Sequence, residues 1–154
     1  YVTLDDLLRH ADVVTIHVPL IPATRHLIDA EKLALMKPSA ILVNTARGAV
    51  VDSAALLASL NEGRLAGAAL DVLEGEEVIS EDRILLDSVG MSMENLSLMV
   101  DAYKLMHHPK VLVTSHIGFY SQEALERILH TTLDNIRQFL RGECQNVVSP
   151  PESL

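Results

Sequence analysis

Short apolar segments rich in β-branched residues alternate with helical patterns along most of the chain. Residues 12–18, 40–44 and 65–72 form three such segments, and a fourth covers residues 110–115. The first three lie about 27 residues apart, which leaves room for one helix between consecutive strands, as parallel pairing requires. Near-continuous apolar strands are typical of a parallel sheet that is covered by helices on both faces. The alternation therefore predicts an α/β fold built on a parallel sheet.

Helix starts and ends can be placed from capping residues. Four residues whose side-chain oxygen can accept from a free backbone N–H stand before helical patterns: Thr3, Asp29, Asp52 and Ser121. Gly63 and Gly142 stand where two helices should end. The last helix, expected over residues 121–142, is amphipathic because one set of apolar side chains recurs at helical spacing: Leu125, Ile128, Leu129, Leu133, Ile136 and Leu140. Residues 143–154 are expected to form a loose tail.

One long acidic segment with several methionines interrupts the alternation. We expect residues 77–109 to leave the sheet as an excursion at its edge, with short helices at 84–89 and 93–106. Packing on the surface and a role as a cap over a substrate both remain open for this segment.

Composition limits the partners that the chain can have. Hydrophobic residues make up 49% of the 154 positions and aromatic residues 3%, so the core must be aliphatic. With 21 acidic and 12 basic residues the net charge is −9, which argues against nucleic acid or an anionic membrane as partner. The apolar runs are far shorter than the roughly 20 residues that span a bilayer, and we see no signal-peptide pattern. Cys144 is the only cysteine, so we expect a reducing, cytoplasmic location.

Functional side chains follow the predicted strands at the points where open parallel sheets bind ligands. Arg47 follows the second strand, Asp71 closes the third, and His116 follows the fourth. Arginine can hold a carboxylate in a bidentate geometry, and histidine can exchange a proton near neutral pH. Because the carboxyl ends of parallel strands meet at one edge, these residues suit a small acid with a hydroxyl or carbonyl beside its carboxylate.

Simpler interpretations of the same residues stay open. Arg47 is a candidate for an internal ion pair, His116 for a satisfied core histidine, and Asp71 for a residue that merely ends a strand. His107 and His108 are adjacent and lack the spacing of zinc ligands, so no metal site is expected.

The acidic run after Asp71 divides into two kinds of residue. Glu74 and Glu77 fit a solvated loop. Glu76 is expected to turn inward, because Gly75 gives the backbone freedom at that point.

Four longer motifs carry a resemblance to a known family. "HVPLIPATRHLI", "MKPSAILVNTARGAVVD", "GRLAGAALDVLEGEE" and "VLVTSHIGFYSQEAL" resemble the D-isomer-specific 2-hydroxyacid dehydrogenases, in the order in which that family has them. The paired "NTARG…VD" and "ALDV-x-E" signatures are highly specific. Within the family, the "EGEE" and "HIGFY" forms are most similar to D-lactate dehydrogenases and D-2-hydroxyisocaproate dehydrogenases.

The resemblance implies a role for individual residues. Arg47 would anchor the substrate carboxylate, Glu76 would pair with the catalytic histidine, and His116 would donate and accept the proton. Phe119 and Tyr120 would shape the substrate pocket together with Arg47. The implied NAD-binding residues are Val18, Pro19, Thr24, Thr45, Ala46, Arg47, Asp71, His116 and Gly118.

The resemblance also implies a Rossmann-type NAD-binding domain of which residues 1–120 form the second half only. The family's G-x-G-x-x-G loop is missing, since no two of the seven glycines are separated by one residue. We therefore expect the chain to begin after the first βαβ half, and the C-terminal helix to return toward an absent substrate domain. Ser115 departs from the family, which usually has proline before the histidine.

The implied activity is the NAD-dependent interconversion of 2-keto acids and D-2-hydroxy acids, by a protein that is a homodimer in its full-length form. Without the glycine loop we expect the isolated chain to be inactive, and its exposed helix stripe to cause poor solubility or oligomerisation. The alternative is a non-catalytic truncated relative or a binding protein on the same fold. The residues do not select between NAD and NADP or among 2-hydroxy acids.

Overall fold

The computed structural model describes residues 1–76, 92–117, 120–143 and 145–147. It divides into two compact units, Tyr1–His116 and Ile117–Leu154. The predicted helix at 84–89 and most of the predicted tail lie outside the described residues.

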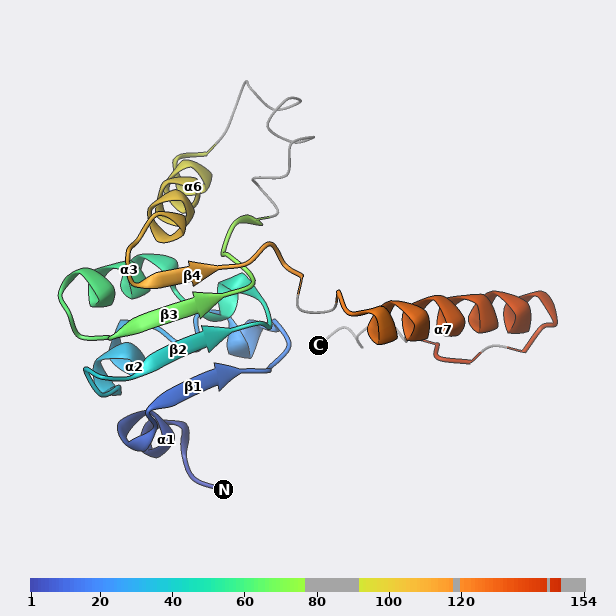
Figure 1. Ribbon diagram of the computed structural model, residues 1–154, viewed down its shortest axis with the longest axis horizontal. Helices are drawn as coiled ribbons and strands as arrows, with labels where there is room; N and C mark the ends of the chain where they lie inside the picture. The colour runs from blue at the N-terminus through green and yellow to red at the C-terminus, as the bar shows by residue number, and fades with distance from the viewer. Residues whose placement is uncertain (77–91, 118–119, 144, 148–154) are drawn as a thin grey trace. The chain divides into compact units, whose positions relative to one another are not determined.

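The N-terminal unit is built on a four-stranded parallel sheet in the order β1-β2-β3-β4 (Figure 1). The strands are β1 (Val13–Ile16), β2 (Ile41–Asn44), β3 (Gly67–Leu70) and β4 (Val111–Val113), each lying within its predicted segment. Val14, Leu42, Ala68 and Val111 lie side by side across the sheet. The predicted α/β fold with a parallel sheet is confirmed.

Helices connect the strands and begin where the capping residues predict. They are α1 (Leu4–His10), α2 (Ala30–Leu35), α3 (Ser53–Asn61) and α6 (Met93–Met106), with 3-10 turns η1 (Pro22–Thr24) and η2 (Gly48–Val50). The side chains of Thr3, Asp29 and Asp52 each accept a hydrogen bond from a first-turn N–H of α1, α2 and α3. Gly63 follows α3 with a left-handed φ of 72°, as its predicted place at a helix end requires.

One face of the sheet is covered and the other is exposed within this unit. Helices α1, α2, α3 and α6 pack in sequence against one another as a single layer. Connections of one hand between strands in sequential order place their helices on the same side of a sheet. Val13 and Leu112, on the opposite side, are therefore 57% and 65% exposed. The prediction that helices cover both faces is wrong for this unit.

The covered face holds the hydrophobic core. Its fully buried side chains are aliphatic, as the composition predicts, and include Leu8, Ile28, Leu33, Leu42, Leu56, Leu60, Leu65 and Leu105. Leu105 lies on α6, which belongs to the connection from β3 to β4. The helix predicted at 93–106 has the expected bounds.

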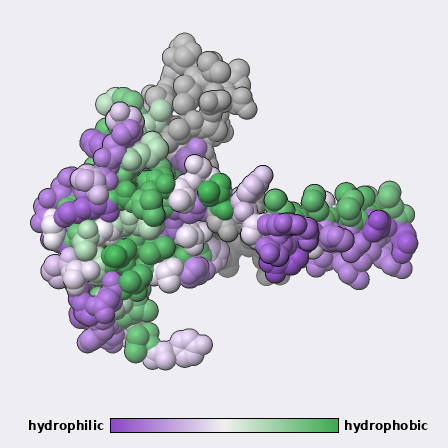
Figure 2. Space-filling model, in the orientation of Figure 1, coloured by the Kyte–Doolittle hydropathy of each residue, from purple (hydrophilic) through white to green (hydrophobic). Residues whose placement is uncertain are grey.

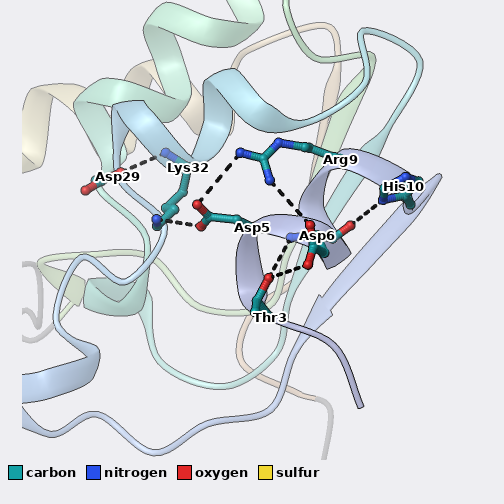
Figure 3. Close-up of polar contacts among 7 residues, drawn as sticks. All are labelled: Thr3, Asp5, Asp6, Arg9, His10, Asp29 and Lys32. Atoms are coloured by element: carbon teal, nitrogen blue, oxygen red, sulfur yellow. Dashed lines mark hydrogen bonds and ion pairs between the residues drawn. The ribbon is translucent and has the colours of Figure 1, made fainter.

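A group of exposed and half-buried polar side chains joins α1 to α2 (Figure 3). Lys32 Nζ donates to Asp5 Oδ1 at 2.7 Å, and Arg9 lies 3.9 Å from the Asp5 carboxylate. The hydrogen bond from Lys32 holds the pKa of Asp5 below its ordinary value, and the same bond raises the pKa of Lys32. These contacts link α1 to α2 at the surface and lie outside the apolar core.

The C-terminal unit is dominated by α7 (Gln122–Leu140), which Ser121 caps. No residue of α7 is buried, and its apolar side chains form a stripe along one side of the helix (Figure 2). The predicted amphipathic helix is confirmed, and the association of the isolated chain through this stripe stays a prediction. No helix in the described part of the chain is both long and apolar enough to cross a membrane.

Candidate active site

The carboxyl ends of β2, β3 and β4 bring three predicted site residues to one edge of the sheet. Arg47 follows β2, Glu76 follows β3, and His116 follows β4. The edge is shared because all four strands run in the same direction.

His116 and Glu76 form a contact at this edge. His116 Nδ1 lies 3.3 Å from Glu76 Oε1, and the two side chains are 48% and 36% exposed. The other carboxylate oxygen of Glu76 accepts the N–H of Leu73 at 3.2 Å, which fixes the carboxylate from its own turn. His116 has a φ of 54°, a left-handed conformation that non-glycine residues adopt rarely. The backbone thus aims the imidazole at Glu76 and leaves Nε2 for another partner.

Arg47 is exposed, and its Nη1 donates to the carbonyl oxygen of Ala46 at 2.7 Å. Among the described carboxylates, none forms an ion pair with it. The buried Asn44 shapes this turn, because its side chain donates to the Arg47 carbonyl at 2.9 Å and accepts the Ala46 N–H at 3.0 Å. An exposed guanidinium on a fixed turn suits an anion that arrives from solution.

The glycine after Arg47 allows two loops to touch. A Cβ on Gly48 would lie 2.1 Å from the Leu73 carbonyl carbon and 2.3 Å from the Glu74 nitrogen. Both are backbone atoms, so no side-chain movement would relieve the clash. Gly48 therefore allows the loop that carries Arg47 to pack directly on the loop that carries Glu76.

An open groove of about 680 Å³ lies at the ends of β1 and β2. It is lined by His17, Val18, Pro19, Leu20, Thr45, Ala46 and Arg47, which include five of the predicted cofactor residues. Thr24 is not among the lining residues. Its hydroxyl donates to the Pro19 carbonyl at 2.6 Å and accepts the Ile21 N–H at 2.9 Å, so it shapes the loop beside the groove.

The remaining predicted site residues have different surroundings. Asp71 is buried and accepts a short hydrogen bond from the Thr114 hydroxyl, which ties the end of β3 to the end of β4. Tyr120 belongs to the C-terminal unit. Gly118 and Phe119 lie outside the described residues. No three metal-binding side chains cluster within the residues described, and the expectation of no metal stays a prediction.

Glu74 corrects a prediction. It is expected in a solvated loop, yet it is only 4% exposed. One carboxylate oxygen lies 2.5 Å from His26 Nε2 and 3.7 Å from Arg25, and the other accepts the Ser53 N–H at 3.3 Å. The prediction fails because these partners come from segments that are distant in sequence. Glu77, given the same interpretation, lies outside the described residues.

Comparison with known proteins identifies the family. Residues 1–118 match the family described as D-isomer specific 2-hydroxyacid dehydrogenase, NAD binding domain. The chain belongs to this family. The resemblance seen in its motifs is thereby confirmed, and so is its relation to D-lactate dehydrogenases.

Relatives of this 2-hydroxyacid dehydrogenase domain include both curated proteins and solved structures. An aromatic 2-oxoacid reductase of Clostridium sporogenes is 37% identical over 147 residues, covering 95% of this chain and 42% of that protein. A D-lactate dehydrogenase structure from Treponema pallidum has a TM-score of 0.80 at 38% identity, covering 97% of this chain and 43% of the other. One from Aquifex aeolicus, in complex with NAD and lactic acid, has a TM-score of 0.78 at 34% identity, covering 93% and 41%. The chain spans about two-fifths of the length of these relatives.

NAD is the cofactor of this domain family, and the groove fits one end of such a molecule. Ala46 and Thr45 leave room above the end of β2, while Val18 and Pro19 supply an apolar wall for a flat ring. The sequence contains no G-x-G-x-x-G loop for the pyrophosphate. The residues present therefore fit the nicotinamide end of the dinucleotide and not the whole of it.

Proposed function

We propose that this chain is the C-terminal part of an NAD-dependent dehydrogenase that interconverts 2-keto acids and D-2-hydroxy acids. The observation that carries the proposal is the 3.3 Å contact between His116 Nδ1 and Glu76 Oε1, on the edge that also presents Arg47. A cation for the carboxylate and a positioned proton donor are what reduction of a 2-keto acid requires.

Arg47 has the role of substrate anchor. Its guanidinium is exposed, forms no ion pair within the described chain, and lines the groove where the nicotinamide ring would bind. Two parallel hydrogen bonds to the substrate carboxylate would hold the carbonyl carbon next to that ring. Lysine, with a single ammonium group, cannot make the same fork.

His116 has the role of proton donor. Glu76 contacts Nδ1, so the proton for the substrate oxygen resides on Nε2. The Glu76 carboxylate thereby fixes which ring nitrogen is left to face the substrate. A nicotinamide held beside Val18, Pro19 and Ala46 would supply the hydride that the carbonyl carbon receives. In the reverse direction His116 takes the hydroxyl proton.

The substrate is proposed only as a class. The relatives are named for aromatic 2-oxo acids and for lactate, so a D-lactate-like activity is one candidate within the class. We also propose that the full-length protein is a homodimer in the cytoplasm. The single cysteine supports a reducing compartment, and light scattering of the purified full-length protein would measure the oligomeric state.

The experiment that tests this function measures NADH-dependent reduction of pyruvate and phenylpyruvate by the full-length protein. We expect His116→Ala to lower kcat by about 10²–10⁴-fold, because a positioned acid is lost. Arg47→Lys should act chiefly on KM, because the carboxylate fork is lost. Arg9→Gln, on the exposed surface of α1, serves as the control and should match wild type. Near-wild-type turnover by His116→Ala would overturn the proposal.

A non-catalytic truncated relative or a binding protein on the same fold is the alternative. Intact mass spectrometry of the native polypeptide in its source cell separates the two. A polypeptide as long as the relatives supports the dehydrogenase. A polypeptide that ends at the present length would direct the search to a binding role.

A further inference from the structure

Glu74 is a buried carboxylate that the mechanism above does not use. It lies two residues before Glu76, yet it is almost fully enclosed whereas Glu76 reaches solvent. A charged side chain is rarely buried without partners that compensate for the lost water. Its partners therefore show what the burial accomplishes.

Three separate segments meet at the Glu74 carboxylate. His26, after η1, places Nε2 2.5 Å from Oε1, and the neighbouring Arg25 lies 3.7 Å from the same oxygen. Ser53, the first residue of α3, donates its N–H to Oε2 at 3.3 Å. His26 has a left-handed φ of 50°, and its N–H donates to the Ala49 carbonyl at 2.8 Å. Glu74 thus joins the loop after β3 to the loop after β1 and to the start of α3.

The segment that Glu74 anchors carries Glu76 and packs against the loop that carries Arg47. The backbone of Gly48 packs directly on Leu73 and Glu74, so the position of Arg47 depends on where that segment lies. Glu76 is held by the same turn, because its N–H donates to the Leu73 carbonyl at 3.3 Å and its side chain accepts from the Leu73 N–H. A small pocket of about 150 Å³ is lined by Arg25, Arg47, Gly48, Glu74 and Glu76, among others, so these groups surround one space.

We propose that Glu74 is a positioning residue for the reaction: its buried carboxylate fixes the loop that carries Arg47 and the loop that carries Glu76 in their working arrangement. The inference rests on the proposed function, since it assigns Glu74 a part in that same site. Glu74 acts through Arg47 and Glu76, and it does not itself contact the substrate. A purely structural carboxylate would affect only how much protein is folded.

The test replaces Glu74 with glutamine in the full-length protein, which keeps the shape and one acceptor but removes the charge. NADH-dependent reduction of pyruvate gives kcat and KM, with kcat corrected for the active fraction by titration of the sites. Calorimetric binding of oxamate, an unreactive 2-keto acid analogue, reports the Arg47 site independently of turnover. We expect kcat/KM to fall about 10²-fold, through a higher KM as well as a lower kcat, and oxamate binding to weaken. Asp5→Asn makes the same carboxylate-to-amide change on α1, outside the site, and should leave all three values unchanged.

A second variant keeps the test decisive if Glu74→Gln folds poorly. His26→Asn removes the imidazole that contacts Glu74, and asparagine tolerates the left-handed φ at this position. We expect the same direction of change in KM and kcat. The double variant should be little worse than either single one, because both remove one shared contact.

The outcomes separate the two proposals. If wild type binds oxamate and reduces pyruvate but Glu74→Gln and His26→Asn match it in KM and active-fraction kcat, the positioning role is overturned and the proposed function stands. Loss of folded protein with unchanged KM and corrected kcat also overturns the positioning role. If wild type neither binds oxamate nor reduces any 2-keto acid, the proposed function fails and the inference fails with it.

Discussion

The edge of the sheet that carries Arg47, Glu76 and His116 contrasts with the face that the helices cover. On the covered face, Leu42 and Leu105 are enclosed by aliphatic side chains, so burial itself holds them in place. At the edge the side chains reach solvent and are held by the backbone beneath them. The difference suggests that activity and stability depend on largely separate residues.

Three local backbone features position the side chains at this edge. Gly48 allows two loops to touch, Asn44 closes the turn before it, and the left-handed backbone of His116 directs the imidazole. None of these contributes much apolar area. Their effect is to place groups that solvent would otherwise leave mobile.

Gly48→Ala is expected to give the largest effect, because Gly48 is the residue at which the Arg47 loop packs against the backbone of Leu73 and Glu74. The added Cβ would meet the Leu73 and Glu74 backbone at 2.1–2.3 Å, so one loop must move. We expect kcat/KM for pyruvate to fall about 10²-fold and the free energy of unfolding to fall by about 1–3 kcal/mol. Steady-state kinetics and urea unfolding of the full-length protein measure the two quantities.

Gly63→Asn is the matched control for that change. A side chain at Gly63 would meet no atom within 4 Å, and asparagine accepts its φ of 72°. It should leave activity unchanged. Full activity in Gly48→Ala would show that the edge does not depend on the contact between the loops.

Leu105→Ala tests the other side of the comparison. Leu105 is buried on α6, and its removal leaves a cavity in the core. We expect the free energy of unfolding to fall by about 2–5 kcal/mol, with KM and the active-fraction kcat unchanged. Leu96→Ala, an exposed leucine of the same helix, should change stability by about 0.5 kcal/mol or less. A large loss of kcat in Leu105→Ala, after correction for unfolded protein, would contradict the separation.

The parts of the fold that could be predicted from the sequence depend on neighbouring residues. Thr3, Asp29 and Asp52 cap their helices because a cap needs only the next three residues. The strand ends that meet at the edge follow from parallel pairing of regularly spaced strands. The family motifs add the roles of Arg47 and His116, which remain proposals.

The parts that could not be predicted depend on residues that are distant in sequence. Glu74 is buried by His26 and Ser53, which lie 48 and 21 positions away, and an acidic run gives no sign of such partners. The exposed sheet face was missed because Val13 and Val14 are both valine, so the strand does not show which side is covered.

Asp5→Asn is expected to have the smallest effect, and it tests whether the helical layer depends on surface charge at all. The hydrogen bond from Lys32 lowers the pKa of Asp5 below its ordinary value of 3.8. Because the folded-state pKa of Asp5 is depressed, the carboxylate stabilises the fold at any pH above the ordinary pKa. This contribution is lost as pH falls through the lowered pKa.

Urea midpoints should therefore differ slightly between wild type and Asp5→Asn near neutral pH and converge in acid below pH 3.8. Added salt should reduce the neutral-pH difference because it screens this half-buried pair at the surface. Lys32→Gln should reproduce the difference, because it removes the same pair. A difference that persists unchanged in acid would assign the effect to the packing of α1 on α2. The Asp5–Lys32 contact would then stabilise the fold as the buried core does, and not through its charge.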